Sequence, residues 1–166
     1  NMKYIVGAKY YYTRGRPEQS VANPSRFIDI IESVKDALKF IEYGTEFLVS
    51  PIIQKDISIV AASNDILWIP GCMTPTEIAL AEQLTCPLGK IFPAETLGPK
   101  YVKSIKPLFP KINFMPTGGI NVDKDTIRSW ISAGAYAIGL GSSLFSPTNE
   151  VDIIDKCKQS LEWVKQ

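Results

Sequence analysis

The chain has 166 residues, 45% of them hydrophobic, and its formal net charge is +1. This composition is typical of one soluble domain with a single core, and the even spread of charge gives no basis for nucleic-acid binding. No apolar run approaches the ~20 residues of a membrane span. Histidine is absent, which excludes His-ligated zinc, a Ser-His-Asp triad and an imidazole base.

Strand-like and helix-like segments alternate from Phe27 onward. Phe27–Ile31 is a candidate strand, and Ser33–Tyr43 has the pattern of the helix that follows it. Five later segments share a short apolar run, then Pro or Gly, then a helical stretch. They are Phe47–Pro51, Ile66–Gly71, Leu88–Pro93, Phe114–Gly119 and Ala137–Gly141. They recur about every 20 to 25 residues, which suits a strand, a crossover helix and two short loops.

Helical periods separate and follow these runs. The predicted helices are Thr76–Leu84, Tyr101–Leu108, Asp125–Ile131 and, within residues 148–166, Val151–Gln166. The apolar stripe of the last helix has to pack on its own domain or on a neighbour, and we favour its own domain. Strands that are apolar throughout are typical of parallel sheets buried on both faces. The predicted fold class is α/β, a (β/α)8 TIM barrel forming a single domain, because no strand is followed by a GxGxxG dinucleotide turn.

The N-terminal part is too short for this barrel. Residues 1–26 remain for two βα units, each of which needs roughly 20 residues or more. A whole barrel typically takes ~200 residues or more. We therefore expect residues 1–31 to be divergent or incomplete, with stretches of the real protein absent from this sequence, because a barrel that lacked a unit would expose strand edges.

Lys90 stands inside one of the apolar strands, in Leu88-Gly89-Lys90-Ile91-Phe92-Pro93. Burial lowers the pKa of a lysine and leaves a share of free amine near neutral pH. A free amine at the end of a parallel strand suits imine (Schiff-base) chemistry on a carbonyl substrate. The alternative is a strand-end lysine whose ammonium group extends to solvent.

Two glycine-rich loops follow the last two strands. Thr117-Gly118-Gly119 ends one strand, and Gly139-Leu140-Gly141-Ser142-Ser143 follows the other. Glycine permits positive φ and bares the backbone N–H groups that bind anions. Phosphate sites in such barrels are built from the loops after strands seven and eight. These glycines could also serve only as tight turns between strands and helices.

Three motifs occur together in order and spacing: Lys-Ile-Phe-Pro-Ala-Glu, Phe-Met-Pro-Thr-Gly-Gly-Ile-Asn and Gly-Leu-Gly-Ser-Ser-Leu-Phe. With them, residues 33–145 resemble the 2-keto-3-deoxy-6-phosphogluconate (KDPG) aldolases, a family that includes 4-hydroxy-2-oxoglutarate (KHG) aldolases and 6-phosphogalactonate aldolases. The resemblance implies a trimeric barrel in which Lys90 forms the imine. It also implies that Pro51 and Phe92 line the pocket and that a phosphate binds at Thr117, Gly118, Gly119 and Ser143.

The general acid/base is not identified in the sequence. The family carries a Glu-x-Thr-x-Arg motif on strand two, and the nearest stretch here is Tyr10–Arg16. If Thr13 is the motif threonine, Tyr11 stands in place of the glutamate and Gly15 in place of the arginine. Arg14 or Arg16 could then hold the substrate carboxylate. Tyr10–Tyr12 could equally be a strand with aromatic packing, and Glu95 is best interpreted as a charge at the start of a helix.

The three cysteines are Cys72, Cys86 and Cys157. They lack CxxC spacing, and together with the absence of a signal peptide they suggest a reducing cytoplasm. Cys72 is interpreted as a packing residue, since no base accompanies it as it would a nucleophile. No metal site and no cofactor are predicted.

The sequence therefore predicts a class I aldolase that cleaves a 2-keto-3-deoxy-6-phospho sugar acid to pyruvate and glyceraldehyde 3-phosphate. The expected partners are this small-molecule substrate, pyruvate and two further copies of the chain in a homotrimer, with no nucleic acid or membrane. KHG aldolase activity, another phosphate-binding barrel enzyme such as an isomerase or epimerase, and a non-catalytic barrel protein are the alternatives.

Overall fold

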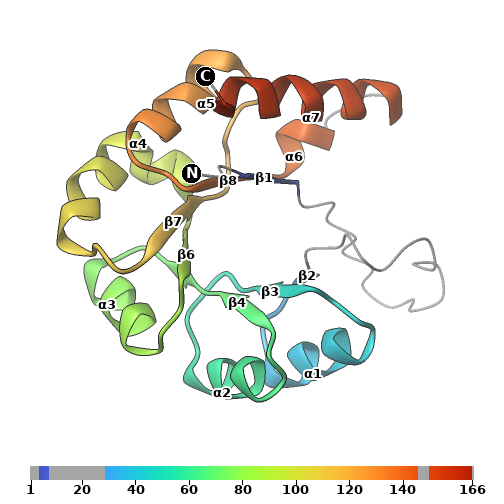
Figure 1. Ribbon diagram of the computed structural model, residues 1–166, viewed down its shortest axis with the longest axis vertical. Helices are drawn as coiled ribbons and strands as arrows, with labels where there is room; N and C mark the ends of the chain where they lie inside the picture. Colours follow the sequence, from blue (N-terminus) through green and yellow to red (C-terminus); the bar gives the residue numbers. More distant parts are fainter. Residues whose placement is uncertain (1–3, 8–28, 146–149, 166) are drawn as a thin grey trace.

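The computed structural model describes residues 4–7, 29–145 and 150–165. The strands are Tyr4–Gly7 (β1), Asp29–Ile30 (β2), Phe47–Val49 (β3), Leu67–Ile69 (β4), Gly71–Cys72 (β5), Leu88–Ile91 (β6), Asn113–Pro116 (β7) and Ala137–Leu140 (β8). The helices are Val34–Glu42 (α1), Lys55–Ser63 (α2), Pro75–Gln83 (α3), Ala94–Ile105 (α4), the 3₁₀ turn Lys106–Leu108 (η3), Lys124–Ser132 (α5), Ser142–Phe145 (α6) and Glu150–Lys165 (α7). Strands line the inside of an arc and helices cover its outside (Figure 1).

The recorded strand pairings are all parallel. β2, β3 and β4 pair in that order, as do β5, β6 and β7, and β1 pairs with β8. Pro70 alone separates β4 from β5, and its carbonyl accepts a hydrogen bond from the Lys90 amide at 2.8 Å. Thr117 bridges Gly139 in the same parallel sense, which joins β7 to β8. The described strands therefore follow one another in the order β2, β3, β4–β5, β6, β7, β8, β1.

The predicted parallel α/β class is confirmed, whereas a closed eight-stranded barrel is not shown. β1 and β2 stand at the two ends of the strand order, and no pairing between them is recorded in the described residues. A barrel closes only when the hydrogen-bond register runs around all of its strands. Residues 8–28, which connect β1 to β2, lie outside the described part of the chain.

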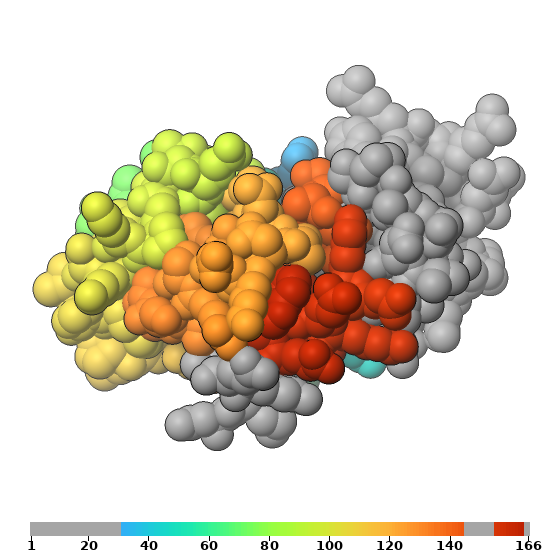
Figure 2. Space-filling view, turned by 90° about the horizontal axis from the view of Figure 1, so that it is seen from above, coloured from blue at the N-terminus to red at the C-terminus, as the bar shows by residue number. Residues whose placement is uncertain are grey.

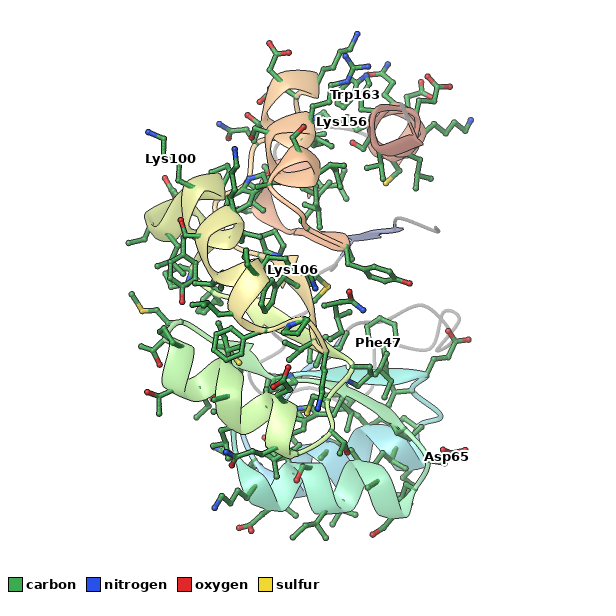
Figure 3. The ribbon with its side chains drawn as sticks, turned by 60° about the vertical axis from the view of Figure 1, so that its left-hand side comes forward. Phe47, Asp65, Lys100, Lys106, Lys156 and Trp163 are labelled. Atoms are coloured by element: carbon green, nitrogen blue, oxygen red, sulfur yellow. The ribbon has the colours of Figure 1, made fainter. Side chains whose placement is uncertain are left out.

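Alternate residues of each strand enter two different cores, because successive side chains in a strand point to opposite faces. The helix-facing core includes Leu48, Trp68, Ile91, Phe114 and Ile138. The core on the inner face of the arc is Val49, Ile69, Met115 and Ala137. Phe47 packs against this inner core, on the side of the strands away from α1 and α2 (Figure 3). Burial on both faces explains why the strands are apolar throughout.

A capping box defines the start of α3. Thr74 Oγ1 accepts a hydrogen bond from the Glu77 amide at 3.3 Å, and the Glu77 carboxylate accepts one from the Thr74 amide at 2.7 Å. Both bonds satisfy amides that have no partner within the helix. Pro75 occupies the first turn, where its missing N–H costs nothing. The helix predicted at Thr76–Leu84 is confirmed to within one residue at each end.

α4 begins seven residues before the predicted Tyr101–Leu108 helix. Its first turn starts at Ala94 and is interrupted at Gly98, whose φ of 72° and ψ of 164° are not helical. Pro99 then opens the longer part of the helix, which gives way to η3 after Ile105. The interruption breaks the helical period, so the first turn could not be recognised in the sequence.

The C-terminal helix packs on its own domain, as expected from its apolar stripe. α7 lies against α5 and β1 (Figure 1), and its described part covers α5 on the face seen in Figure 2. Val164 is buried, and Trp163 packs against the helix-facing core. Among the described residues, no helix is long and apolar enough to cross a membrane.

Candidate active site

Lys90 is a fully buried lysine near the end of β6. Its side chain is only 1% exposed. The strand register pairs it with Gly71 of β5 and with Met115 of β7, so alternation places it on the inner, apolar face of the arc. Its neighbours in sequence, Gly89 and Ile91, are buried on the opposite face. The strand therefore carries a single cationic side chain into an apolar interior.

The environment of the Lys90 amine makes its charged form less favourable than in water. Nζ lies 4.5 Å from the centroid of the Phe92 ring, and no carboxylate partner for it is recorded among the described residues. Burial lowers the pKa of Lys90 from 10.5 to about 8, because desolvation disfavours the ammonium form. About a tenth of the side chain is therefore free amine at pH 7, and this is the form that attacks a carbonyl carbon.

Pro51 follows β3 and reaches the same interior. The Ser50 amide donates to the Ile69 carbonyl at 3.2 Å, so the chain stays extended beyond the last residue of β3. The carbonyl of Pro51 then occupies the space that a side chain at position 71 would need. A Cβ added to Gly71 would stand only 2.0 Å from the Pro51 oxygen. Because Gly71 is the register partner of Lys90, Pro51 and Lys90 flank the same glycine.

The loop after β7 is hydrogen-bonded to the end of β6 and to the start of α4. The Thr117 amide donates to the Ile91 carbonyl at 3.0 Å, and the Thr117 carbonyl accepts from the Ala94 amide at 2.9 Å. The next carbonyl, that of Gly118, accepts from the Glu95 amide at 3.0 Å. These three bonds hold the glycine loop beside the strand that carries Lys90.

Gly118 and Gly119 present bare backbone next to Phe92 and Glu95. Their φ angles are 98° and 70°, in the region that favours glycine. A Cβ at Gly118 would lie 3.0 Å from the Phe92 ring, which itself contacts Lys90. No acceptor for the Gly119 amide is recorded among the described residues, and such an N–H group in a left-handed turn can bind an anion.

Ser143 lies in the short helix α6, which follows β8 directly. Its hydroxyl donates to the Ile120 carbonyl at 2.5 Å and so ties the loop after β8 to the loop after β7. The predicted residues of the imine and anion sites that fall in the described part of the chain therefore lie together at the carboxyl ends of β3, β6, β7 and β8.

Glu95 contacts the glycine loop as well. A Cβ at Gly119 would stand 2.1 Å from Glu95 Oε2, so the carboxylate rests on the bare backbone of Gly119. Glu95 is exposed in the first turn of α4, where the helix N-terminus favours a negative charge. The interpretation as a helix-start charge agrees with this place, and the contact gives a second reason for glycine at position 119.

Gly139 has a different role from the one the sequence indicated. The sequence assigned it to an anion-binding loop, but it lies within β8. A Cβ there would stand 2.3 Å from Thr117 Oγ1, so glycine leaves room for the Thr117 hydroxyl, which donates to the Met115 carbonyl at 3.2 Å. The sequence did not indicate that close contacts require glycine at positions 71 and 139, because the groups that contact Gly71 and Gly139 are distant in sequence.

Several predicted groups lie outside the described residues. Arg14 and Arg16, predicted to hold the substrate carboxylate, fall in the part of the chain without a described placement, and so does Tyr10–Tyr12. Their roles stay predictions. The general acid/base is likewise not identified by the described residues.

The cysteines take no part in this site. Cys72 and Cys86 are buried and unpaired. Burial raises the pKa of the Cys72 thiol to about 12, with the charge of Glu77 adding to the shift, so the thiol is protonated at neutral pH and is a poor nucleophile. Its interpretation as a packing residue is confirmed by its place in the helix-facing core. No group of residues that could hold a metal ion occurs in the described ranges.

The family model for KDPG and KHG aldolases matches residues 30–157. This is well over half of the chain and contains both the lysine strand and the two glycine loops. The chain belongs to this family. The resemblance seen in residues 33–145 is thereby confirmed.

Three similar proteins illustrate the family. A 2-dehydro-3-deoxy-6-phosphogalactonate aldolase of Escherichia coli (strain K12) is 32% identical over 110 residues, which are 66% of this chain and 53% of that protein. A 4-hydroxy-2-oxoglutarate/2-dehydro-3-deoxyphosphogluconate aldolase from TTHB1 superposes with a TM-score of 0.73 at 30% identity, over 80% of this chain and 66% of that one. A KDPG aldolase from Legionella pneumophila, solved with pyruvate as a covalent carbinolamine, has a TM-score of 0.60 at 25% identity, over 76% of this chain and 60% of its own.

The chain is shorter than these family members. It spans about half the length of the curated relatives that it matches first, 53% and 50% of their residues.

Replacing Lys90 by methionine should stabilise the fold at neutral pH. Below pH 8 the folded protein holds a buried ammonium group that the unfolded chain hydrates, which lowers stability. From about pH 8 to 10.5 the unfolded chain binds more protons than the folded one, so wild-type stability rises with pH. We expect Lys90→Met to raise the free energy of unfolding by about 1–3 kcal/mol at pH 7.

Chemical denaturation at pH 7 and at pH 10 measures this difference, which should shrink at the higher pH. Leu88→Met, on the same face of β6, is the matched control and should show no such pH dependence. Equal unfolding free energies of wild type and Lys90→Met at both pH values would show that the amine is hydrated in the folded state.

Proposed function

We propose that this chain carries the active site of a class I aldolase that cleaves a 2-keto-3-deoxy-6-phospho sugar acid to pyruvate and glyceraldehyde 3-phosphate. The observation that supports it most is the fully buried Lys90, whose amine lies in an apolar interior next to a glycine loop suited to an anion. Membership of the KDPG and KHG aldolase family supports the proposal as well.

The Lys90 amine begins the reaction. Its lone pair attacks the C2 keto carbon, and the carbinolamine loses water to give a protonated imine. The imine accepts the electron pair of the C3–C4 bond as that bond breaks, while a general acid/base takes the proton of the C4 hydroxyl. The resulting enamine is protonated at C3, and water then releases pyruvate and regenerates Lys90. The Legionella pneumophila relative, solved with pyruvate as a covalent carbinolamine, supports the last of these steps, in which water adds to the imine of pyruvate.

The backbone of the glycine loop is proposed to hold the phosphate at the far end of the substrate. Gly118 contacts Phe92, which in turn contacts the lysine, so an anion at the loop would fix the distance between C2 and the amine. Thr117 and Ser143 support this loop by hydrogen bonds. Pro51 would pack against the pyruvate half from the other side.

KHG aldolase activity, with pyruvate and glyoxylate as products, is the second candidate. It is favoured by the similar TTHB1 structure, whose name includes 4-hydroxy-2-oxoglutarate. This substrate has no phosphate, so the dependence of the rate on the glycine loop distinguishes the two activities.

Trapping experiments test the imine. Incubation with pyruvate and sodium borohydride should add one pyruvyl group on the peptide that contains Lys90, because only an imine is reduced to a stable adduct. Lys90→Arg should give no adduct and no measurable cleavage, since a guanidinium stays protonated and cannot attack a carbonyl. Lys106→Arg is the control and should label like wild type. An adduct on another lysine, read by peptide mass spectrometry, contradicts the assignment.

A substitution in the glycine loop tests the phosphate site. Gly119→Ala should raise KM for the phosphorylated substrate about tenfold or more, because the new methyl group strains a backbone with φ of 70° and displaces Glu95. Gly44→Ala is the matched control: its φ is 79°, and nothing lies near the added Cβ. Gly44→Ala should lose stability without a change in KM. Equal KM values in both variants would leave Gly119 with only a turn role.

The complete enzyme is proposed to be a cytoplasmic homotrimer of closed barrels, as the family resemblance implies. Light scattering at micromolar concentration should give a mass of about 55 kDa for this chain, three times 18.4 kDa. A mass near 18 kDa with full activity would reject the trimer.

A further inference from the structure

A buried hydrogen-bond chain lies on the helix side of β3 and β4. The indole Nε1 of Trp68 donates to Ser50 Oγ at 3.0 Å, and the Ser50 hydroxyl donates to the Ile52 carbonyl at 2.6 Å. Ser50 has no exposed surface, and Trp68 is 4% exposed. The hydroxyl therefore accepts from one strand and donates into the turn that follows the other.

This turn is the one that reaches Lys90. Between Ser50 and Ile52 stands Pro51, whose carbonyl carbon and oxygen would lie 2.2 and 2.0 Å from a Cβ at Gly71. The Ile52 nitrogen would lie 2.8 Å from the same Cβ. The turn thus covers Gly71 on the inner face, directly beside its register partner Lys90.

We propose that Trp68 and Ser50 are positioning residues that hold the Pro51 turn over Gly71 and so keep water away from Lys90. The inference rests on the proposed aldolase function for its catalytic consequence. If Ser50 served only to satisfy the buried indole N–H of Trp68, accepting that one hydrogen bond would be enough. The second bond of Ser50, to the carbonyl of the exposed Ile52, extends the hydrogen bonding into the turn itself.

In this proposal the turn limits the hydration of the Lys90 amine. The described residues that share the face of Lys90 on neighbouring strands are uncharged: Val49, Ile69, Gly71, Met115, Thr117 and Ala137. Desolvation by burial lowers the pKa of Lys90. Water admitted by a loosened turn would restore part of that hydration and raise the pKa.

The test compares Ser50→Ala and Trp68→Phe with Thr45→Val. Thr45 stands just before the other end of β3, is 7% exposed, and donates its hydroxyl to the Phe47 carbonyl at 3.0 Å. Thr45→Val therefore removes a buried bond of the same kind far from the turn. The measurement is the rate of borohydride-trappable pyruvate adduct from pH 6 to pH 10.

We expect Ser50→Ala and Trp68→Phe to move the midpoint of this profile upward by about one pH unit, with a rate about tenfold lower at pH 7. Near pH 10 their rates should approach that of wild type, since the amine is then largely neutral in all variants. Thr45→Val should keep the wild-type midpoint.

An unchanged midpoint in the Ser50 and Trp68 variants, with stability losses like that of Thr45→Val, would overturn the proposal. If Ser50→Ala does not fold, Trp68→Phe decides alone, since it keeps an aromatic ring and removes the N–H donor together with part of the indole volume. The Lys90 pKa is also read without substrate, from the pH dependence of the unfolding free energy relative to Lys90→Met. A wild type that traps no pyruvate rejects the aldolase function, while this substrate-free pKa still decides the positioning role.

Discussion

Burial of one amine in an apolar interior is the constraint on which the rest of this site depends. Lys90 is 1% exposed, and the cost of desolvating its charge lowers its pKa to about 8. The same cost opposes folding, because a buried ammonium without a counter-charge is unfavourable. The contact with the Phe92 ring offsets only part of this desolvation cost, since a cation–π contact contributes about 0.5–2 kcal/mol. Hydrophobic packing in the helix-facing core therefore has to offset the unfavourable free energy of the buried ammonium group on the inner face.

Glycines allow close contacts between the segments that surround the strand of Lys90. Gly71 admits the Pro51 carbonyl, and Gly139 admits the Thr117 hydroxyl. Gly118 allows the loop after β7 to lie on Phe92. Carbonyl and amide groups held in this way keep their positions without losing side-chain entropy. The packing around the strand that carries Lys90 therefore depends on these glycines as well as on the buried side chains.

Local signals made part of this arrangement predictable. A lysine within an apolar strand identified Lys90, and the helical period of Thr76–Leu84 identified α3, because each is decided by neighbours in sequence. β1 was not recognised, since four residues are too few to show a period. The bond from Trp68 to Ser50 joins residues 18 positions apart, and only the parallel register brings them together. The early start of α4 was hidden by the break at Gly98.

Lys106 shows that a lysine in contact with an aromatic ring can still have partners for its ammonium group. Its Nζ lies 5.3 Å from the Phe114 ring centroid, beneath α4 on the helix side of the sheet (Figure 3). It also donates to the Ile112 carbonyl at 2.8 Å, and the charge of Glu82 opposes the lowering of its pKa by burial. These partners stabilise the ammonium form. Lys90 has the ring contact without such partners among the described residues, and this difference supports its proposed role as the nucleophile.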